Sequence, residues 1–148
     1  MPEQHRIAFI GTGSRAVAYG RHYAVCPEVR IVAVADPSEP HRKLFAQRSK
    51  MSEEAMACMA EYDDAKTLLA EHGDELDGAV VVSPNHLHAE HALPLLERGL
   101  PVAIEKPLAT SPGDCRRILD AERLNGARTL LGFVLRSTPF YAKIHELL

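Results

Sequence analysis

Residues 6–16 read Arg-Ile-Ala-Phe-Ile-Gly-Thr-Gly-Ser-Arg-Ala. The apolar start of this stretch predicts a buried strand, and the two glycines that follow predict a tight turn into a helix. Gly11 permits the turn, and Gly13 lets backbone N–H groups approach a pyrophosphate at the positive end of the helix. Ala16 stands at the third small-residue position, where helix and strand pack closely. The pattern is therefore typical of a unit that binds a dinucleotide.

An acidic residue, Asp36, closes the second apolar run, Ile31 to Ala35. At this point of a dinucleotide-binding unit an acid hydrogen-bonds the ribose hydroxyls and repels the 2′-phosphate of NADP. The sequence therefore favours NAD as the cofactor. NADP stays open, because Arg42 follows closely enough in the sequence to contact a phosphate.

Short apolar runs alternate with amphipathic stretches, which predicts a doubly wound parallel sheet of the Rossmann type, an α/β fold with about six strands. A helix capped by Ser111 is expected to end at Gly126, and another is expected from Asn85 or His86 to Gly99, kinked or split at Pro94. The third strand is expected to be brief, near Met59, after a helical turn. The other strands are expected at His5–Ile10, Val29–Ala35, Gly78–Ser83, Pro101–Glu105 and Thr129–Phe133.

The composition is that of an ordinary globular protein: 148 residues, about one domain, 46% hydrophobic and 25% charged. A net charge of -3 offers no basic surface suited to nucleic acid. No apolar run is long enough to span a membrane, and the first residues do not read as a signal peptide. Cys26, Cys58 and Cys115 form no CxxC pair and are expected to be small buried hydrophobes. These features favour a reducing, cytoplasmic setting.

Two turns carry the candidate chemistry, because ligands of open α/β sheets bind at the carboxyl ends of the strands. Ser83-Pro84-Asn85 follows the predicted fourth strand, and Glu105-Lys106-Pro107 follows the fifth. The Lys106 side chain could place an ammonium beside a carbonyl or alkoxide oxygen and transfer a proton.

The remaining charged clusters have simpler interpretations. His86, His88, Glu90 and His91 lack the i, i+4 spacing of two helical metal ligands, so solvated histidines at a helix start are favoured over a metal site. The basic pairs Arg42-Lys43 and Arg116-Arg117 are expected on the solvent faces of helices.

The glycine turn, Asp36, Pro84-Asn85-x-x-His88 and above all Glu105-Lys106-Pro107 resemble the GFO/IDH/MocA family of oxidoreductases. The resemblance spans residues 5 to about 145, with every motif in the expected order. It implies hydride transfer between NAD or NADP and a sugar, inositol or related alcohol. It also implies a second, C-terminal α+β domain built on a large open sheet.

The resemblance also implies roles for single residues. Gly11, Thr12, Gly13, Ser14 and Arg15 would surround the pyrophosphate, and Asp36 would bind the adenosine ribose. Lys106 would be catalytic. The remaining cofactor contacts would come from residues that follow the fourth, fifth and sixth strands: Ser83, Pro84, Asn85, His88, Glu105 and Arg136.

Residues 1–134 are thus expected to form the NAD(P)-binding Rossmann domain, and residues 135–148 to begin the substrate domain. We expect the chain to be a truncated portion that does not turn over alone, while the full-length protein, acting on a small polyol or sugar-like substrate, forms a homo-oligomer. Without its partner domain, an apolar face around Phe133, Phe140 and Tyr141 would be exposed.

Two other functions remain open on the sequence. A dinucleotide sensor of the same fold could bind NAD(P) and a protein partner without catalysis, although it would not need the Lys106 ammonium. An S-adenosylmethionine enzyme shares a glycine turn and an acid after the second strand, but it would leave Glu105-Lys106-Pro107 unexplained.

Overall fold

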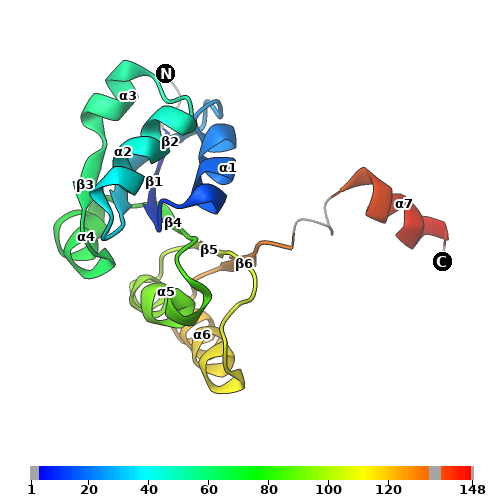
Figure 1. Ribbon diagram of the computed structural model, residues 1–148. Coiled ribbons are helices and arrows are strands. Elements are labelled where there is room, and N and C mark those ends of the chain that lie inside the picture. Colours follow the sequence, from blue (N-terminus) through cyan, green and yellow to red (C-terminus); the bar gives the residue numbers. More distant parts are fainter. Residues whose placement is uncertain (1–3, 134–137, 148) are drawn as a thin grey trace.

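The computed structural model describes residues 4–133 and 138–147, and its centre is a parallel sheet (Figure 1). Six strands lie in the order β3-β2-β1-β4-β5-β6. Every neighbouring pair is parallel, which confirms the predicted doubly wound α/β fold. The strands are β1 (His5–Ile10), β2 (Val29–Ala35), β3 (Ala60–Tyr62), β4 (Gly78–Val81), β5 (Val102–Ile104) and β6 (Thr129–Leu131).

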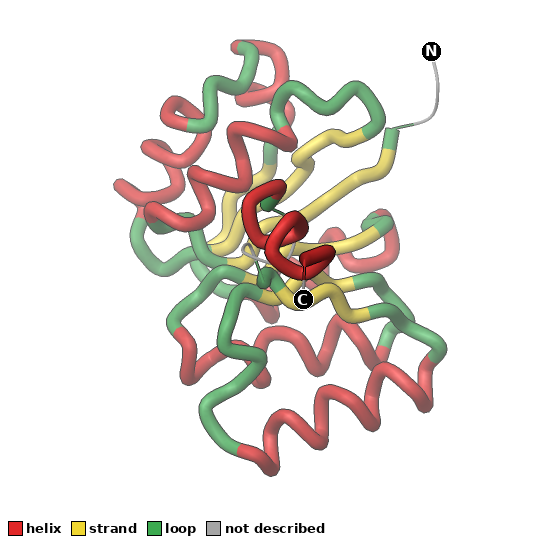
Figure 2. Tube along the Cα trace, turned by 90° about the vertical axis from the view of Figure 1, so that its right-hand side faces the viewer, coloured by secondary structure: helices red, strands yellow, loops and turns green. Residues whose placement is uncertain are grey.

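Helices cover both faces of the sheet (Figure 2). In the part of the chain that the structure describes, none of them has the length and apolar character that crossing a bilayer requires. The α-helices are α1 (Ser14–Tyr23), α2 (Glu39–Arg48), α3 (Glu53–Cys58), α4 (Ala65–His72), α5 (His88–Glu97), α6 (Pro112–Asn125) and α7 (Pro139–Leu147), and the short 3-10 helices are η1 (Gly73–Glu75) and η2 (Asn85–Leu87).

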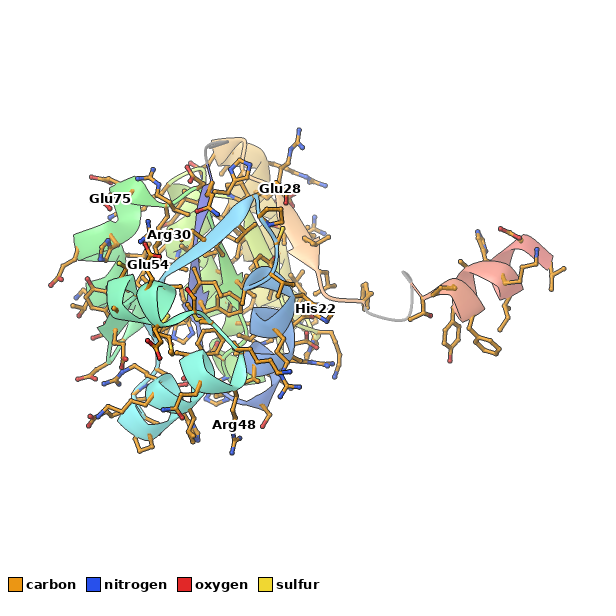
Figure 3. The ribbon with its side chains drawn as sticks, turned by 90° about the horizontal axis from the view of Figure 1, so that it is seen from above. His22, Glu28, Arg30, Arg48, Glu54 and Glu75 are labelled. Atoms are coloured by element: carbon orange, nitrogen blue, oxygen red, sulfur yellow. The ribbon has the colours of Figure 1, made fainter. Side chains whose placement is uncertain are left out.

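Alternate residues of the strands face two separate hydrophobic clusters, as the two-residue period of a strand requires. In β1, Ile10 packs with α4, α5 and α6, while Phe9 packs with α1 and α2. Phe45 of α2 lies 5.1 Å from Phe9, measured between ring centroids. Most charged side chains lie outside these layers, and Figure 3 labels exposed examples of both signs, such as Arg48 and Glu54.

Side-chain caps begin several helices where the sequence places Ser or Asp. Ser111 accepts a hydrogen bond from the Asp114 N–H at 3.0 Å, and Gly126 ends α6 in the left-handed conformation, as predicted. Asp64 caps α4 in the same way, and Ser38 caps α2. The predicted helical turn before the third strand is confirmed as α3.

Three expectations need correction. Pro94 does not split its helix: α5 runs through it, and the break between η2 and α5 comes earlier, at His88. Burial of Leu95 and Leu96 against the sheet outweighs the lost backbone hydrogen bond, since each buried leucine contributes about 1.5–3 kcal/mol.

The cysteines are not core residues, because Cys58 is exposed and the other two are half-buried. Strands four to six are shorter than predicted, because their last residues turn into the loops of the carboxyl edge.

The fold brings the turns that follow β1, β2, β4 and β5 to one edge of the sheet, because all these strands run in the same direction. The strand order reverses between β1 and β4, where the chain leaves toward opposite sides. Such a switch point opens a crevice at the carboxyl edge of a parallel sheet.

The glycine turn gives a direct stability test. Gly11→Ala should lower the free energy of unfolding by about 1–3 kcal/mol, since Gly11 has φ +93° and an added Cβ would lie 2.7 Å from backbone atoms of Val82 and Ser83. Gly13→Ala is the matched control, because its φ is -68° and nothing lies within 4 Å of its Cβ position. Urea unfolding followed by far-UV circular dichroism measures both. An equal loss in the two variants would contradict this account of the turn.

Candidate functional site

The first turn of the carboxyl edge is held by backbone contacts. The Gly11 N–H donates to the Ala35 carbonyl at 2.8 Å, which ties the turn after β1 to the end of β2. On its other side Gly11 lies against the backbone of Val82 and Ser83. Three turns therefore meet at one glycine.

Helix α1 starts at this point with an open N-terminus. Its N-cap, Gly13, provides no side-chain hydrogen bond, and the first helical bond runs from the Val17 N–H to the Gly13 carbonyl. The N–H groups of residues 14–16 therefore lack intrahelical acceptors. The buried Thr12 Oγ1 also has no partner among the described residues. The absence of a side chain at Gly13 and these donors together fit a phosphate group.

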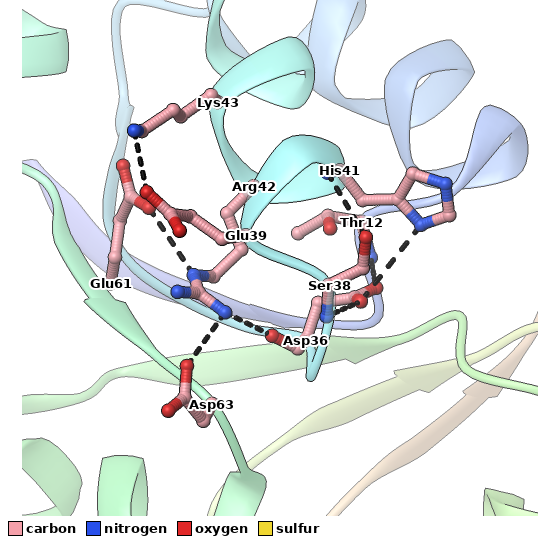
Figure 4. A network of polar contacts seen from close by, with 9 residues as sticks. All are labelled: Thr12, Asp36, Ser38, Glu39, His41, Arg42, Lys43, Glu61 and Asp63. Atoms are coloured by element: carbon pink, nitrogen blue, oxygen red, sulfur yellow. Dashed lines mark hydrogen bonds and ion pairs between the residues drawn. The ribbon is translucent and has the colours of Figure 1, made fainter.

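Asp36 is held rigidly beside this turn (Figure 4). Its Oδ2 accepts the Thr12 N–H at 2.8 Å, and its Oδ1 accepts the Ser38 N–H at 2.9 Å. The side chain is only 13% exposed, and the His41 ring lies 3.9 Å away. A carboxylate oxygen accepts more than one hydrogen bond, so each oxygen can still receive a hydroxyl group.

A cavity of about 310 Å³ runs along the carboxyl edge from the Asp36 turn to the turn after β4. It is mostly apolar, which suits a flat ring system flanked by polar groups. Its lining consists of Ile10, Gly11, Ala35, Asp36, Pro37, Asp63, Asp64, Ala65, Ser83, Pro84, Leu87 and His91.

Arg42 does not lie on a solvent face, as the sequence had suggested, but is buried beneath the Asp36 turn. Its Nε donates to Glu61 at 3.2 Å, and its Nη1 lies 2.8 Å from the Asp63 carboxylate and donates to the Asp36 carbonyl (Figure 4). A buried guanidinium needs such partners, because an unpaired charge is costly to desolvate. Lys43, by contrast, is exposed and pairs with Glu39, as expected for a solvent face.

Two histidines lie behind the turn after β4. His88 is 1% exposed, and its Nδ1 and Nε2 lie 2.7 Å from the Pro107 carbonyl and 3.0 Å from the Ser83 carbonyl. His91 Nδ1 lies 2.9 Å from Ser83 Oγ, and burial lowers the pKa of this ring. The expectation of solvated histidines is therefore wrong for both. His88 joins the turns after β4 and β5 by contacting their backbone carbonyls, so it fixes the position of these turns beside the cavity.

Glu105 points back beneath the edge of the sheet toward α1. Its Oε2 accepts the Tyr19 hydroxyl at 2.5 Å, and its Oε1 lies 3.2 Å from Arg15 Nε. Gly132 leaves room for this contact, because an added Cβ would lie 2.7 Å from the Tyr19 oxygen. Burial and the hydrogen bond to Glu105 raise the pKa of Tyr19 to about 12. The Arg15 side chain thus links the glycine turn to the turn after β5.

The other residues of the two turns face outward. Pro84, Asn85 and Lys106 are exposed, and the peptide bond between Lys106 and Pro107 is cis. Arg136 lies outside the described residues. No group of three or more His, Cys, Asp or Glu within residues 4–133 and 138–147 is placed to hold a metal ion.

Sequence reasoning missed three residues around the site: Tyr19, Glu61 and Asp63. Tyr19 follows Arg15 by four positions, so both lie on one face of α1, and this spacing is the signal that was available. The pairing of Glu61 and Asp63 with Arg42 had no such signal, since it joins β3 to α2 through tertiary structure.

The chain is similar to known proteins over nearly its whole length. A family model described as an oxidoreductase family with an NAD-binding Rossmann fold, GFO_IDH_MocA, matches residues 5–133. Inositol 2-dehydrogenase of Gluconacetobacter diazotrophicus is 33% identical over 144 residues, which are 96% of this chain and 40% of that protein. Inositol 2-dehydrogenase 1 of Saccharopolyspora erythraea is 31% identical over 145 residues, which are 97% of this chain and 41% of that protein.

Among solved structures, myo-inositol dehydrogenase from Lactobacillus casei in complex with NAD(H) and myo-inositol superposes with a TM-score of 0.83 at 25% identity. The match covers 97% of this chain and 41% of that one. The chain therefore spans about two fifths of the length of the proteins that it matches.

Tyr19→Phe should lower the free energy of unfolding by about 1.5 kcal/mol near pH 7.5, because it removes a hydrogen bond to a carboxylate. The raised pKa of Tyr19 favours the neutral phenol in the folded state. This contribution is complete below pH 10, the ordinary tyrosine value, and is lost as the pH rises toward 12. The difference between wild type and Tyr19→Phe in urea unfolding should therefore shrink above pH 10. The exposed Tyr141→Phe is the control, and a difference that does not change with pH would refute the role of this hydrogen bond.

Proposed function

The chain belongs to the GFO/IDH/MocA family of oxidoreductases, and from this we propose that it is the NAD-binding part of a dehydrogenase that acts on a polyol. One observation carries the proposal: the open N-terminus of α1 and the rigidly held Asp36 carboxylate lie on adjacent turns, joined by the hydrogen bond from the Thr12 N–H to Asp36. A pyrophosphate and a ribose need these two groups at neighbouring positions.

The proposed cofactor site follows the edge of the sheet. Residues 11–15 would receive the pyrophosphate, with N–H groups from the start of α1 as donors. The Thr12 N–H is already used by Asp36, so Thr12 contributes its unpaired hydroxyl instead. Asp36 would accept the two ribose hydroxyls, which favours NAD over NADP, and the part of the apolar cavity beside it, lined by Pro37 and Asp64, would receive the adenine.

The reaction would take place at the other end of the site, between the turns after β4 and β5. When bound there, the nicotinamide supplies the hydride acceptor. Ser83, Pro84, Asn85 and Glu105 would line it, with His88 holding their two turns together from behind. Lys106 would be the catalytic residue, because its exposed ammonium can give or take a proton at the substrate oxygen.

The substrate and domain assignments rest on the relatives. Two of them are named inositol 2-dehydrogenases, and a third is bound to myo-inositol, which supports a small polyol as substrate. We place the Rossmann domain at residues 1–134 and the start of a substrate domain at residues 135–148. Arg136 would contribute to the cofactor or substrate from that junction. The exposed Phe133, Phe140 and Tyr141 suit contact with further protein.

Titration of this chain with NADH and NADPH, followed by the fluorescence of the reduced cofactor, tests the proposal. We expect saturable binding of both, with NADH preferred. Gly13→Ala should weaken NADH binding at least about tenfold, because its Cβ would occupy the approach of the pyrophosphate. This variant should keep the fold intact, because nothing lies within 4 Å of the added Cβ. Equal NADH binding by Gly13→Ala, or none by the folded wild type, would refute the proposed site.

The proposed role of Lys106 is tested in a complete dehydrogenase that contains this chain. Lys106→Ala should lower kcat by about 10²- to 10⁴-fold, the usual contribution of a general acid or base. The affinity for NADH should stay within about twofold, since the side chain is directed at the substrate oxygen. Lys43→Ala, at an exposed ion pair, is the control. Normal turnover of Lys106→Ala would remove Lys106 from the mechanism.

A further inference from the structure

Three acidic groups and one buried cation surround the turn where the proposed ribose site lies. Asp36 ends β2, Glu61 lies on β3, and Asp63 follows it. The register of the two strands places Glu61 beside Val34, so both acids reach the end of β2. Arg42 comes from α2 on the other side of the turn, and its guanidinium fills the space between them (Figure 4).

We infer that Glu61 and Asp63 are determinants of cofactor choice, because they withhold Arg42 from the 2′-phosphate of NADP. The inference rests on the proposed function and extends it beyond Asp36. Arg42 donates to the carbonyl of Asp36, the residue whose carboxylate would hold the ribose. The guanidinium is therefore bonded to the backbone of the residue that would hold the ribose, while Glu61 and Asp63 pair with its Nε and Nη1.

The contacts explain why Arg42 stays withheld. Its Nε is bound to Glu61, and its Nη1 is shared by Asp63 and the Asp36 carbonyl. The side chain is 10% exposed, so turning toward a nucleotide would leave Glu61 without this partner.

The two acids that pair with Arg42 differ in how far their side chains are exposed. The Glu61 side chain is 35% exposed, whereas that of Asp63 is 81% exposed. Replacing the Asp63 carboxylate therefore removes a charge without opening the core. Replacement of both acids by their amides would leave Arg42 with weaker, neutral acceptors and free it to pair with a phosphate.

The test is the ratio of dissociation constants for NADPH and NADH, measured by cofactor fluorescence on the chain with Glu61→Gln and Asp63→Asn combined. We expect the ratio to fall roughly tenfold toward NADPH, as a gained charge-assisted hydrogen bond implies. Adding Arg42→Gln to the double variant should return the ratio to the wild-type value. Asp63→Asn alone should shift the ratio in the same direction by a smaller factor, and it serves if the double variant does not fold.

Glu39→Gln is the matched control, because it removes an acid of the same turn and helix that pairs with Lys43 rather than Arg42. It should change the ratio by less than about twofold. The inference is overturned if the ratio is unchanged in the Glu61→Gln and Asp63→Asn variants, or if the shift survives the addition of Arg42→Gln. In either case, NADH binding by the wild type still upholds the proposed function. A folded wild type that binds neither nucleotide overturns both.

Discussion

Gly11 lies so close to the end of β4 that no side chain fits between them. An added Cβ would meet the backbone of Val82 and Ser83 at 2.7 Å, and the residue has a positive φ that only glycine adopts without strain. The carboxyl edge depends on this contact. It sets the distance between the first and fourth strand ends, and with it the place of the cavity, the direction of α1 and the position of Asp36.

Electrostatics divide the edge into two ends. At one end, backbone N–H groups orient the Asp36 carboxylate, and the buried guanidinium of Arg42 pairs with Glu61 and Asp63. At the other end, the His91 ring, whose pKa is lowered by burial, contacts Ser83, and the exposed Lys106 follows the buried Glu105. This arrangement suits a ligand with hydroxyl groups at one end and a ring at the other, with phosphates between them on the open helix terminus.

The Glu-Lys-Pro turn separates two neighbouring side chains by burial. Glu105 is 9% exposed and is anchored by Tyr19 and Arg15, so its carboxylate faces the inside of the domain. Lys106 is exposed at the surface of the same turn. His88 adds a second anchor by contacting the carbonyl of Pro107. The buried neighbours therefore hold the backbone from which the lysine projects.

Local chemistry in the sequence determined the strands of the sheet, the glycine turn, the cap at Ser111 and the turns at strand ends, because strand period, glycine freedom and capping act over a few residues. The extent of the strands, the passage of α5 through Pro94 and the exposure of Cys58 depended on packing between distant elements. Only the tertiary structure decided that Arg42 is buried, that His88 bridges two turns and that Tyr19 holds Glu105. Each of these contacts joins segments of different elements, and the free energy of a buried polar group depends on partners that the neighbouring sequence does not reveal.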